Sequence, residues 1–113
     1  MVHQNSSRFY NRVAYDTTYT GLGDFEERTE GERLGEALGQ NSVLFMGNHG
    51  VLTAAESVDV AFDDMYFLEK AAMIQALAYS TNQEVKEIDE RVVAHTSKQF
   101  LEILPFLAKK HLD

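Results

Sequence analysis

The short sequence Asn48-His49-Gly50 is the part of the chain whose residue types and spacing best suit chemistry. Its histidine stands between two mainly apolar runs, residues 42–46 and 51–53, so a turn between two predicted strands would present the imidazole. A neutral imidazole on a rigid turn is well placed to bind a metal ion, and glycine lets a ligand approach the backbone. Asparagine and glycine also occur at turns without any function, and a histidine between them can simply face water. The motif alone leaves both interpretations open.

Other polar side chains are weaker candidates. The chain has no cysteine, so a metal site must use His, Asp or Glu. His95 and His111 are predicted to be exposed on helices, and they lack His-x-His spacing with any other histidine. Asp63 and Asp64 fall early in a predicted helix and suit its dipole, so a solvated or capping role is favoured over paired-carboxylate catalysis. Tyrosines that could donate protons or line a pocket cannot be assigned a role; these are Tyr10, Tyr15, Tyr19, Tyr66 and Tyr79.

The elements that would position the turn alternate between strand and helix. In chain order we expect a strand at residues 12–17, a loop at 21–23, a helix at 24–38, strands at 42–46 and 51–53, a helix at 58–78 and a helix from about 84. The helix at 58–78 has apolar residues at i, i+3, i+4 and i+7 spacing and Ser57 as a cap. Gly39 is expected to end the helix at 24–38. Because Pro105 lacks an N–H, the last helix should end or bend near Leu104, and a short terminal helix follows.

Composition limits the class of protein. The chain has 113 residues and is 44% hydrophobic, which fits one domain with a real core. Its formal net charge of -8 argues against nucleic acid and anionic membrane surfaces as partners. No apolar run is long enough to span a membrane, and the first residues are too polar for a secretory signal. The sequence therefore predicts a soluble, cytoplasmic protein.

Most of the chain resembles the class II aldolase/adducin family. The resemblance is strongest over residues 43–78, where Asn48-His49-Gly50 is followed by Ala61-Phe62-Asp63-Asp64 and by Leu68-Glu69-Lys70-Ala71-Ala72. Upstream, His3-Gln4-Asn5, Arg8-Phe9-Tyr10 and Val13-Ala14-Tyr15-Asp16 are similar to a stretch found in decarboxylase-like and bacterial branches of the family. The region around His95 is compatible with a later helix of the family.

The resemblance implies a fold, a cofactor and an assembly. The fold would be an α/β/α sandwich with a mainly antiparallel sheet and long C-terminal helices, and family members often form tetramers. A divalent metal, usually zinc, would be held by histidines, of which His49 would be one. In the aldolases that metal polarises a carbonyl, so that an adjacent C–C bond can form or break, and related members perform decarboxylation.

The family's other metal ligands lie in a His-x-His motif before the position of His3, and its catalytic carboxylate lies earlier still; the sequence contains neither. We therefore expect residues 1–113 to be a single, truncated family domain that binds zinc weakly or not at all, with His3 as a slightly better substitute ligand than His95 or His111. The predicted function is a zinc-dependent aldolase or lyase acting on a small carbonyl or carboxylate compound, as an incomplete catalytic unit within a homo-oligomer. The alternative is a non-catalytic, adducin-like interaction module.

Overall fold

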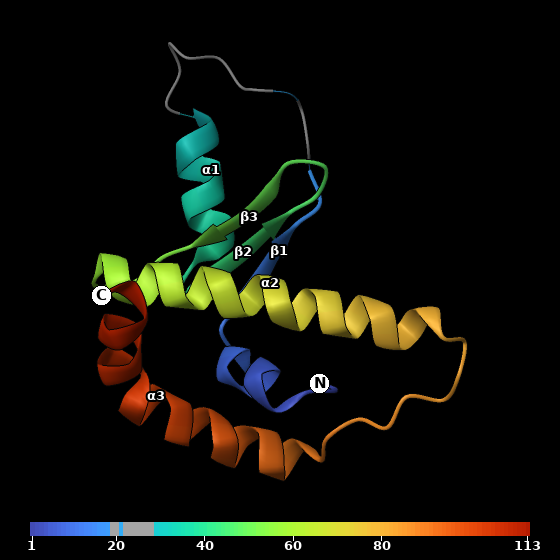
Figure 1. The fold of residues 1–113 in the computed structure, drawn as a ribbon. Coiled ribbons are helices and arrows are strands. Elements are labelled where there is room, and N and C mark those ends of the chain that lie inside the picture. Colours follow the sequence, from blue (N-terminus) through green and yellow to red (C-terminus); the bar gives the residue numbers. More distant parts are fainter. Residues whose placement is uncertain (19–20, 22–28) are drawn as a thin grey trace. The chain divides into compact units, whose positions relative to one another are not determined.

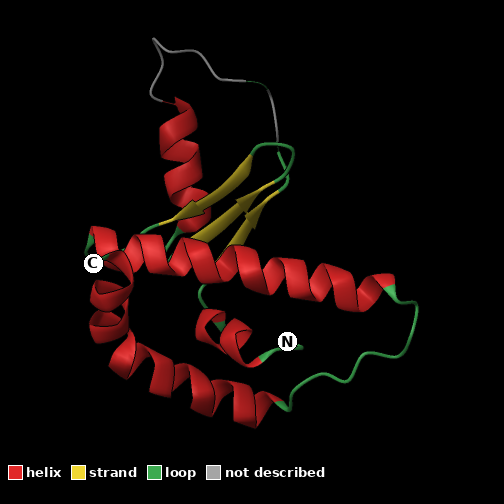
Figure 2. Cartoon of the chain, viewed as in Figure 1, coloured by secondary structure: helices red, strands yellow, loops and turns green. Residues whose placement is uncertain are grey.

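A computed structural model describes the chain at residues 1–18, 21 and 29–113. The described elements, drawn in Figure 1 and coloured by type in Figure 2, are a 3₁₀-helix η1 (Gln4–Phe9), β1 (Val13–Asp16), α1 (Thr29–Leu38), β2 (Val43–Met46), β3 (Gly50–Thr53), α2 (Val58–Ser80) and α3 (Glu90–Leu112). The chain divides into two compact units. The mixed unit comprises residues 11–54, and the helical unit comprises residues 1–10 and 55–113.

The mixed unit is a three-stranded sheet in the order β1-β2-β3, with α1 packed against β1 and β2. β1 pairs with β2 in parallel, with Val13 opposite Val43 and Asp16 opposite Met46. β2 and β3 form an antiparallel hairpin. The central strand β2 contains Val43 and Leu44, which are fully buried, as the apolar run predicts.

The helical unit consists of η1, α2 and α3, and Figure 1 shows η1 between the two long helices. Its apolar core is formed by buried side chains from all three elements: Phe9, Leu68, Ala71, Val93, Leu104 and Ala108. The same interior also contains charged groups, because Arg8, Asp63 and Asp64 are buried. Buried charges need partners, and these three side chains contact one another. Among the described residues, no helix combines the length and apolar character that a membrane-crossing segment requires.

The predicted order of strands and helices is confirmed, and several details differ. The sheet is mixed, because one of its two strand pairings is parallel, whereas a mainly antiparallel sheet was expected. The last helix begins at Glu90 and not near residue 84, since the Asp89 side chain caps it by accepting a hydrogen bond from the Arg91 amide at 2.9 Å. Residues 19–20 and 22–28, which include the start of the predicted helix 24–38, lie outside the described part of the chain.

Pro105 lies inside α3, which continues to Leu112 as one helix. Figure 1 shows α3 changing direction along its length, as expected where a proline removes a hydrogen bond and clashes with the carbonyl of Leu101. The predicted bend is therefore confirmed, while the predicted separate terminal helix is part of α3.

Candidate functional site

The turn between β2 and β3 presents His49 on the surface of the mixed unit. Met46 and Gly50 pair across the hairpin, and the His49 amide donates to the Met46 carbonyl oxygen at 3.1 Å. Asn48 adopts a φ of 59° and Gly50 a φ of 151°, both in the region that asparagine and glycine tolerate best. His49 is exposed. The sequence Asn-His-Gly thus forms a tight turn with an outward histidine, as its residue types predict.

The base of this turn is anchored to β1. The Gly47 amide donates to the Asp16 carbonyl oxygen at 2.8 Å, which extends the parallel ladder by one bond. A side chain at Gly47 would begin 3.5 Å from that oxygen and 3.6 Å from the Cα of Thr17, so the two segments are in van der Waals contact. The position of His49 therefore depends on the end of β1.

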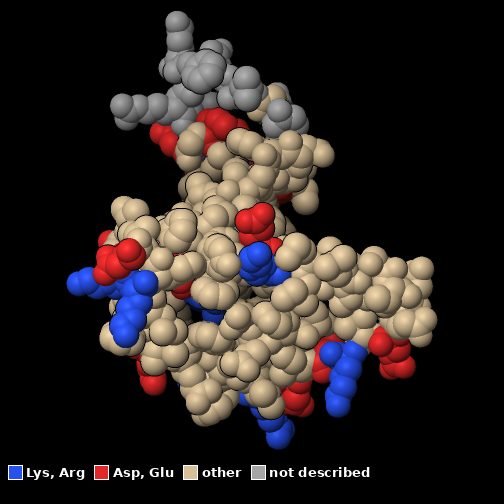
Figure 3. Space-filling view, viewed as in Figure 1, with Lys and Arg blue, Asp and Glu red and all other residues tan. Residues whose placement is uncertain are grey.

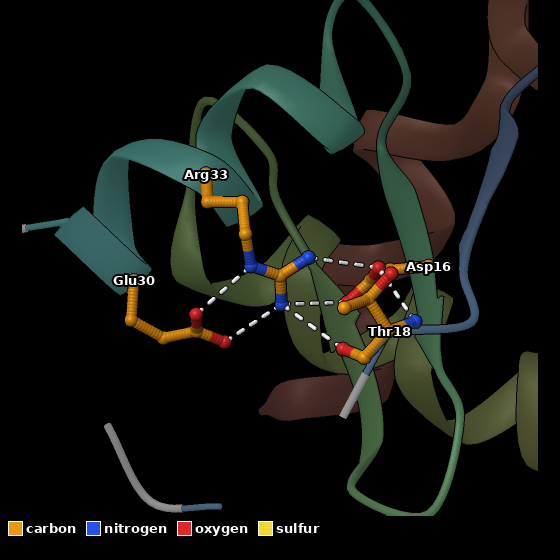
Figure 4. Close-up of polar contacts among 4 residues, drawn as sticks. All are labelled: Asp16, Thr18, Glu30 and Arg33. Atoms are coloured by element: carbon orange, nitrogen blue, oxygen red, sulfur yellow. Dashed lines mark hydrogen bonds and ion pairs between the residues drawn. The ribbon is translucent and has the colours of Figure 1, made fainter. Parts of the chain in front are cut away.

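The end of β1 is itself held by a charged cluster of Asp16, Glu30 and Arg33 (Figure 4). The Arg33 guanidinium of α1 donates to both carboxylate oxygens of Asp16, from Nη1 to Oδ1 at 2.9 Å and from Nη2 to Oδ2 at 2.8 Å. It also donates to both oxygens of Glu30, at 2.9 Å from Nε and 2.7 Å from Nη2, and to the Thr18 carbonyl oxygen at 3.2 Å. Paired contacts of this kind fix both distance and orientation.

The electrostatics of this cluster favour its ionised form. Hydrogen bonding from Arg33 lowers the pKa of the Asp16 carboxyl below its ordinary value of 3.8, with a further contribution from the Thr18 amide. Hydrogen bonding from the same guanidinium lowers the pKa of the Glu30 carboxyl. The pKa of Arg33 is raised, chiefly by Glu30 and then by Asp16. At neutral pH the three side chains therefore have a net charge of −1 close to His49.

The described residues do not by themselves form a metal centre. No group of three or more His, Asp or Glu side chains that could hold an ion occurs within residues 1–18, 21 and 29–113. The other candidate histidines, His3, His95 and His111, all belong to the helical unit. His95 is exposed, as predicted, whereas His3 is only half-buried at the start of η1. A complete zinc site normally needs three or four protein ligands, which this set does not supply.

The prediction that Asp63 and Asp64 are solvated or cap the helix is wrong. Their side chains are 2% and 1% exposed, and the Nη2 of Arg8 contacts Asp63 at 2.5 Å and Asp64 at 2.9 Å. His111 completes the group, with its Nδ1 2.7 Å from Asp63 Oδ1 and its side chain 31% exposed. These carboxylates of α2 can point into the interior because Arg8 of η1 contacts them there. The spacing of residues within α2 does not predict this contact, since Arg8 comes from another element.

The tyrosines mostly have structural partners. The Tyr10 hydroxyl donates to Glu90 at 2.7 Å, and the Tyr79 hydroxyl donates to Glu87 at 2.9 Å, which raises the pKa of Tyr79. Tyr15 stacks on Phe45 in the mixed unit. Tyr66 meets the His111 ring edge-on, and Tyr19 lies outside the described residues.

The surface charge agrees with the acidic composition. On the face drawn in Figure 3, the described Lys and Arg side chains are scattered among acidic and uncharged ones and form no continuous basic surface.

Sequence comparison identifies the family of most of the chain. Residues 1–76, which include the His49 turn, match the family described as "Class II Aldolase and Adducin N-terminal domain". No match is found among curated proteins.

Two solved structures resemble the chain closely. An aldolase II superfamily protein from Pseudomonas syringae is 36% identical with a TM-score of 0.80, over 98% of this chain and 44% of the relative. The L-fuculose 1-phosphate aldolase from Glaciozyma antarctica PI12 is 32% identical with a TM-score of 0.70, over 88% of this chain and 35% of the relative. The chain thus spans less than half the length of each.

Proposed function

Because the chain belongs to the class II aldolase and adducin family, we propose that it forms part of a zinc-dependent aldolase or lyase and supplies one metal ligand, His49. The reaction would be C–C bond cleavage or decarboxylation of a small carbonyl or carboxylate compound.

The observation that supports this role is the exposed position of His49 on a tight turn within the matched residues 1–76. A histidine at the tip of a hairpin can bind a cation without displacing a core side chain. The net negative charge of the Asp16, Glu30 and Arg33 cluster also favours a cation nearby.

The described residues act here as a scaffold for one ligand and not as a complete catalytic unit. Since they do not fit a full zinc site, we derive no catalytic step through the metal. What these residues do is fix the imidazole at a defined place on the surface. A single imidazole binds zinc weakly, so we expect weak binding by the chain alone.

Equilibrium dialysis against zinc, followed by elemental analysis, tests the proposal. The chain should retain zinc above the buffer level, and His49→Ala should lose this excess. His95→Ala is the matched control, because it removes an exposed histidine from α3 and should leave zinc content unchanged. Equal occupancy in the chain and in His49→Ala would remove His49 from the site and would favour the adducin-like alternative.

We further propose that the chain acts in the cytoplasm as a homo-oligomer. Several large apolar side chains are exposed on its helices, including Val58 and Leu77 on α2 and Phe106 on α3. Exposed apolar side chains in this number favour association with another protein surface.

A further inference from the structure

The Arg33 guanidinium binds both ends of the connection between β1 and α1. At the first end it contacts the Asp16 carboxylate and the Thr18 carbonyl oxygen, and at the other end it contacts Glu30 in the first turn of α1. The Thr18 amide also donates to Asp16 Oδ1 at 3.1 Å. One side chain therefore fixes the geometry of the residue with which β1 ends.

That residue also anchors the turn of His49. The Asp16 side chain contacts Arg33, while its main-chain carbonyl oxygen accepts the hydrogen bond of the Gly47 amide. Rotation of the Asp16 carboxylate away from Arg33 would loosen the last peptide of β1. The hydrogen bond at the base of the turn would then open more often.

We propose that Arg33 is a positioning residue for His49, because it fixes the end of β1 to which the turn of His49 is anchored. The paired hydrogen bonds between guanidinium and carboxylate allow one relative orientation, whereas a single ammonium contact allows many. Glu30 lies three residues before Arg33 on α1, and its ion pair with the guanidinium helps to orient that group toward Asp16. The Asp16 side chain is only 8% exposed, so solvent screens its contact with Arg33 less than it screens most surface ion pairs.

Amide hydrogen exchange measured by NMR tests this inference without any metal. Arg33→Gln should speed exchange of the Gly47 amide by about threefold to tenfold and should shift or broaden the ring signals of His49. The Val43 amide is the internal reference, because it bonds to the Arg12 carbonyl oxygen at the opposite end of the same ladder and should change little.

Further variants separate positioning from general stability. Asp16→Asn should reproduce the effect of Arg33→Gln, and Arg33→Lys should give an intermediate effect because it retains the charge without the paired geometry. Glu30→Gln should also speed Gly47 exchange, but by less. Glu32→Gln is the control, because it removes the charge of an exposed residue on the same helix and should leave Gly47 exchange unchanged.

Two results would overturn the inference. One is Gly47 exchange within about twofold of the parent chain in both Arg33→Gln and Asp16→Asn. The other is an equal loss of protection at the Gly47 and Val43 amides, which would indicate general destabilisation. If Arg33→Gln does not fold, the same criteria apply to Asp16→Asn and Arg33→Lys. The inference rests on the proposed function only in taking His49 as the functional side chain, and failure of zinc binding would leave these exchange results unaffected.

Discussion

Arg8 is the cation that makes two buried carboxylates compatible with the interior of the helical unit. Its side chain is 3% exposed and contacts both Asp63 and Asp64. Its guanidinium carbon also lies 4.8 Å from the centroid of the Phe67 ring, so the charge is held by aromatic as well as acidic groups. Removing the cation would take the Arg8 contact from both buried carboxylates, while the contact between His111 and Asp63 at 2.7 Å would remain.

Arg8→Met keeps most of the side-chain volume and removes the charge. We expect it to lower the free energy of unfolding by about 3–5 kcal/mol, which is the usual cost of breaking a buried ion pair from one side. Arg8→Lys should cost less, since it retains the charge but loses the planar fork. Urea denaturation followed by circular dichroism measures both, and a loss below about 1 kcal/mol in Arg8→Met would contradict this account.

Individual residues differ in how far the sequence reveals their environment. The outward position of His49 was predictable, because the conformations of its turn follow from its own asparagine and glycine. The burial of Asp63 was not, because it depends on Arg8, which is 55 residues away in the chain. The Arg33 cluster was readable only in part, since Glu30 and Arg33 are helix neighbours while Asp16 comes from another element.

The hairpin turn is the element on which the position of His49 depends most directly. Asn48 has a φ of 59°, which costs little for asparagine and more for residues with a branched Cβ. Because the residue is exposed, substitution there tests backbone conformation without disturbing the core.

Asn48→Val should therefore lower the free energy of unfolding by about 1–2 kcal/mol relative to the parent chain. Asn48→Gly is the matched control and should stay within about 0.5 kcal/mol of it, because glycine adopts positive φ readily. Thermal or chemical denaturation of the two variants gives the comparison. Equal stabilities would mean that the turn does not require this conformation in solution.

At the scale of elements, local signals in the sequence succeeded where they were strong. The hairpin and α2 were predicted because apolar runs and helical spacing are local patterns. The start of α3 was placed too early, because the apolar residues between 84 and 89 continue the helical spacing although the Asp89 cap begins the helix. Pro105 predicted a bend correctly, but the helix continues past it to Leu112, with Leu104 and Ala108 both buried.

For the whole molecule, strand pairing was the hardest feature to predict. β1 pairs in parallel with β2, and α1 lies between them in the chain, so the pairing depends on contacts distant in sequence. Family resemblance supplied the fold class, whereas composition and periodicity alone indicated only alternating helices and strands.

Association is the testable property at this scale. Size-exclusion chromatography with light scattering should give a mass above that of the monomer, and the double variant Leu77→Ser, Phe106→Ser should shift the population toward the monomer by removing two exposed apolar side chains. Glu32→Gln, which changes an exposed polar residue, should leave the mass unchanged. A parent chain that elutes as a clean monomer would contradict the proposed homo-oligomer.

NMR of the histidine ring nitrogens during a zinc titration tests most directly whether the imidazole of His49 binds a divalent metal. We predict that one ring nitrogen of His49 shifts progressively and saturates with zinc, while the ring nitrogens of His95 remain unchanged. A His49 signal that stays fixed while zinc binds elsewhere, or while no zinc binds at all, would contradict the account.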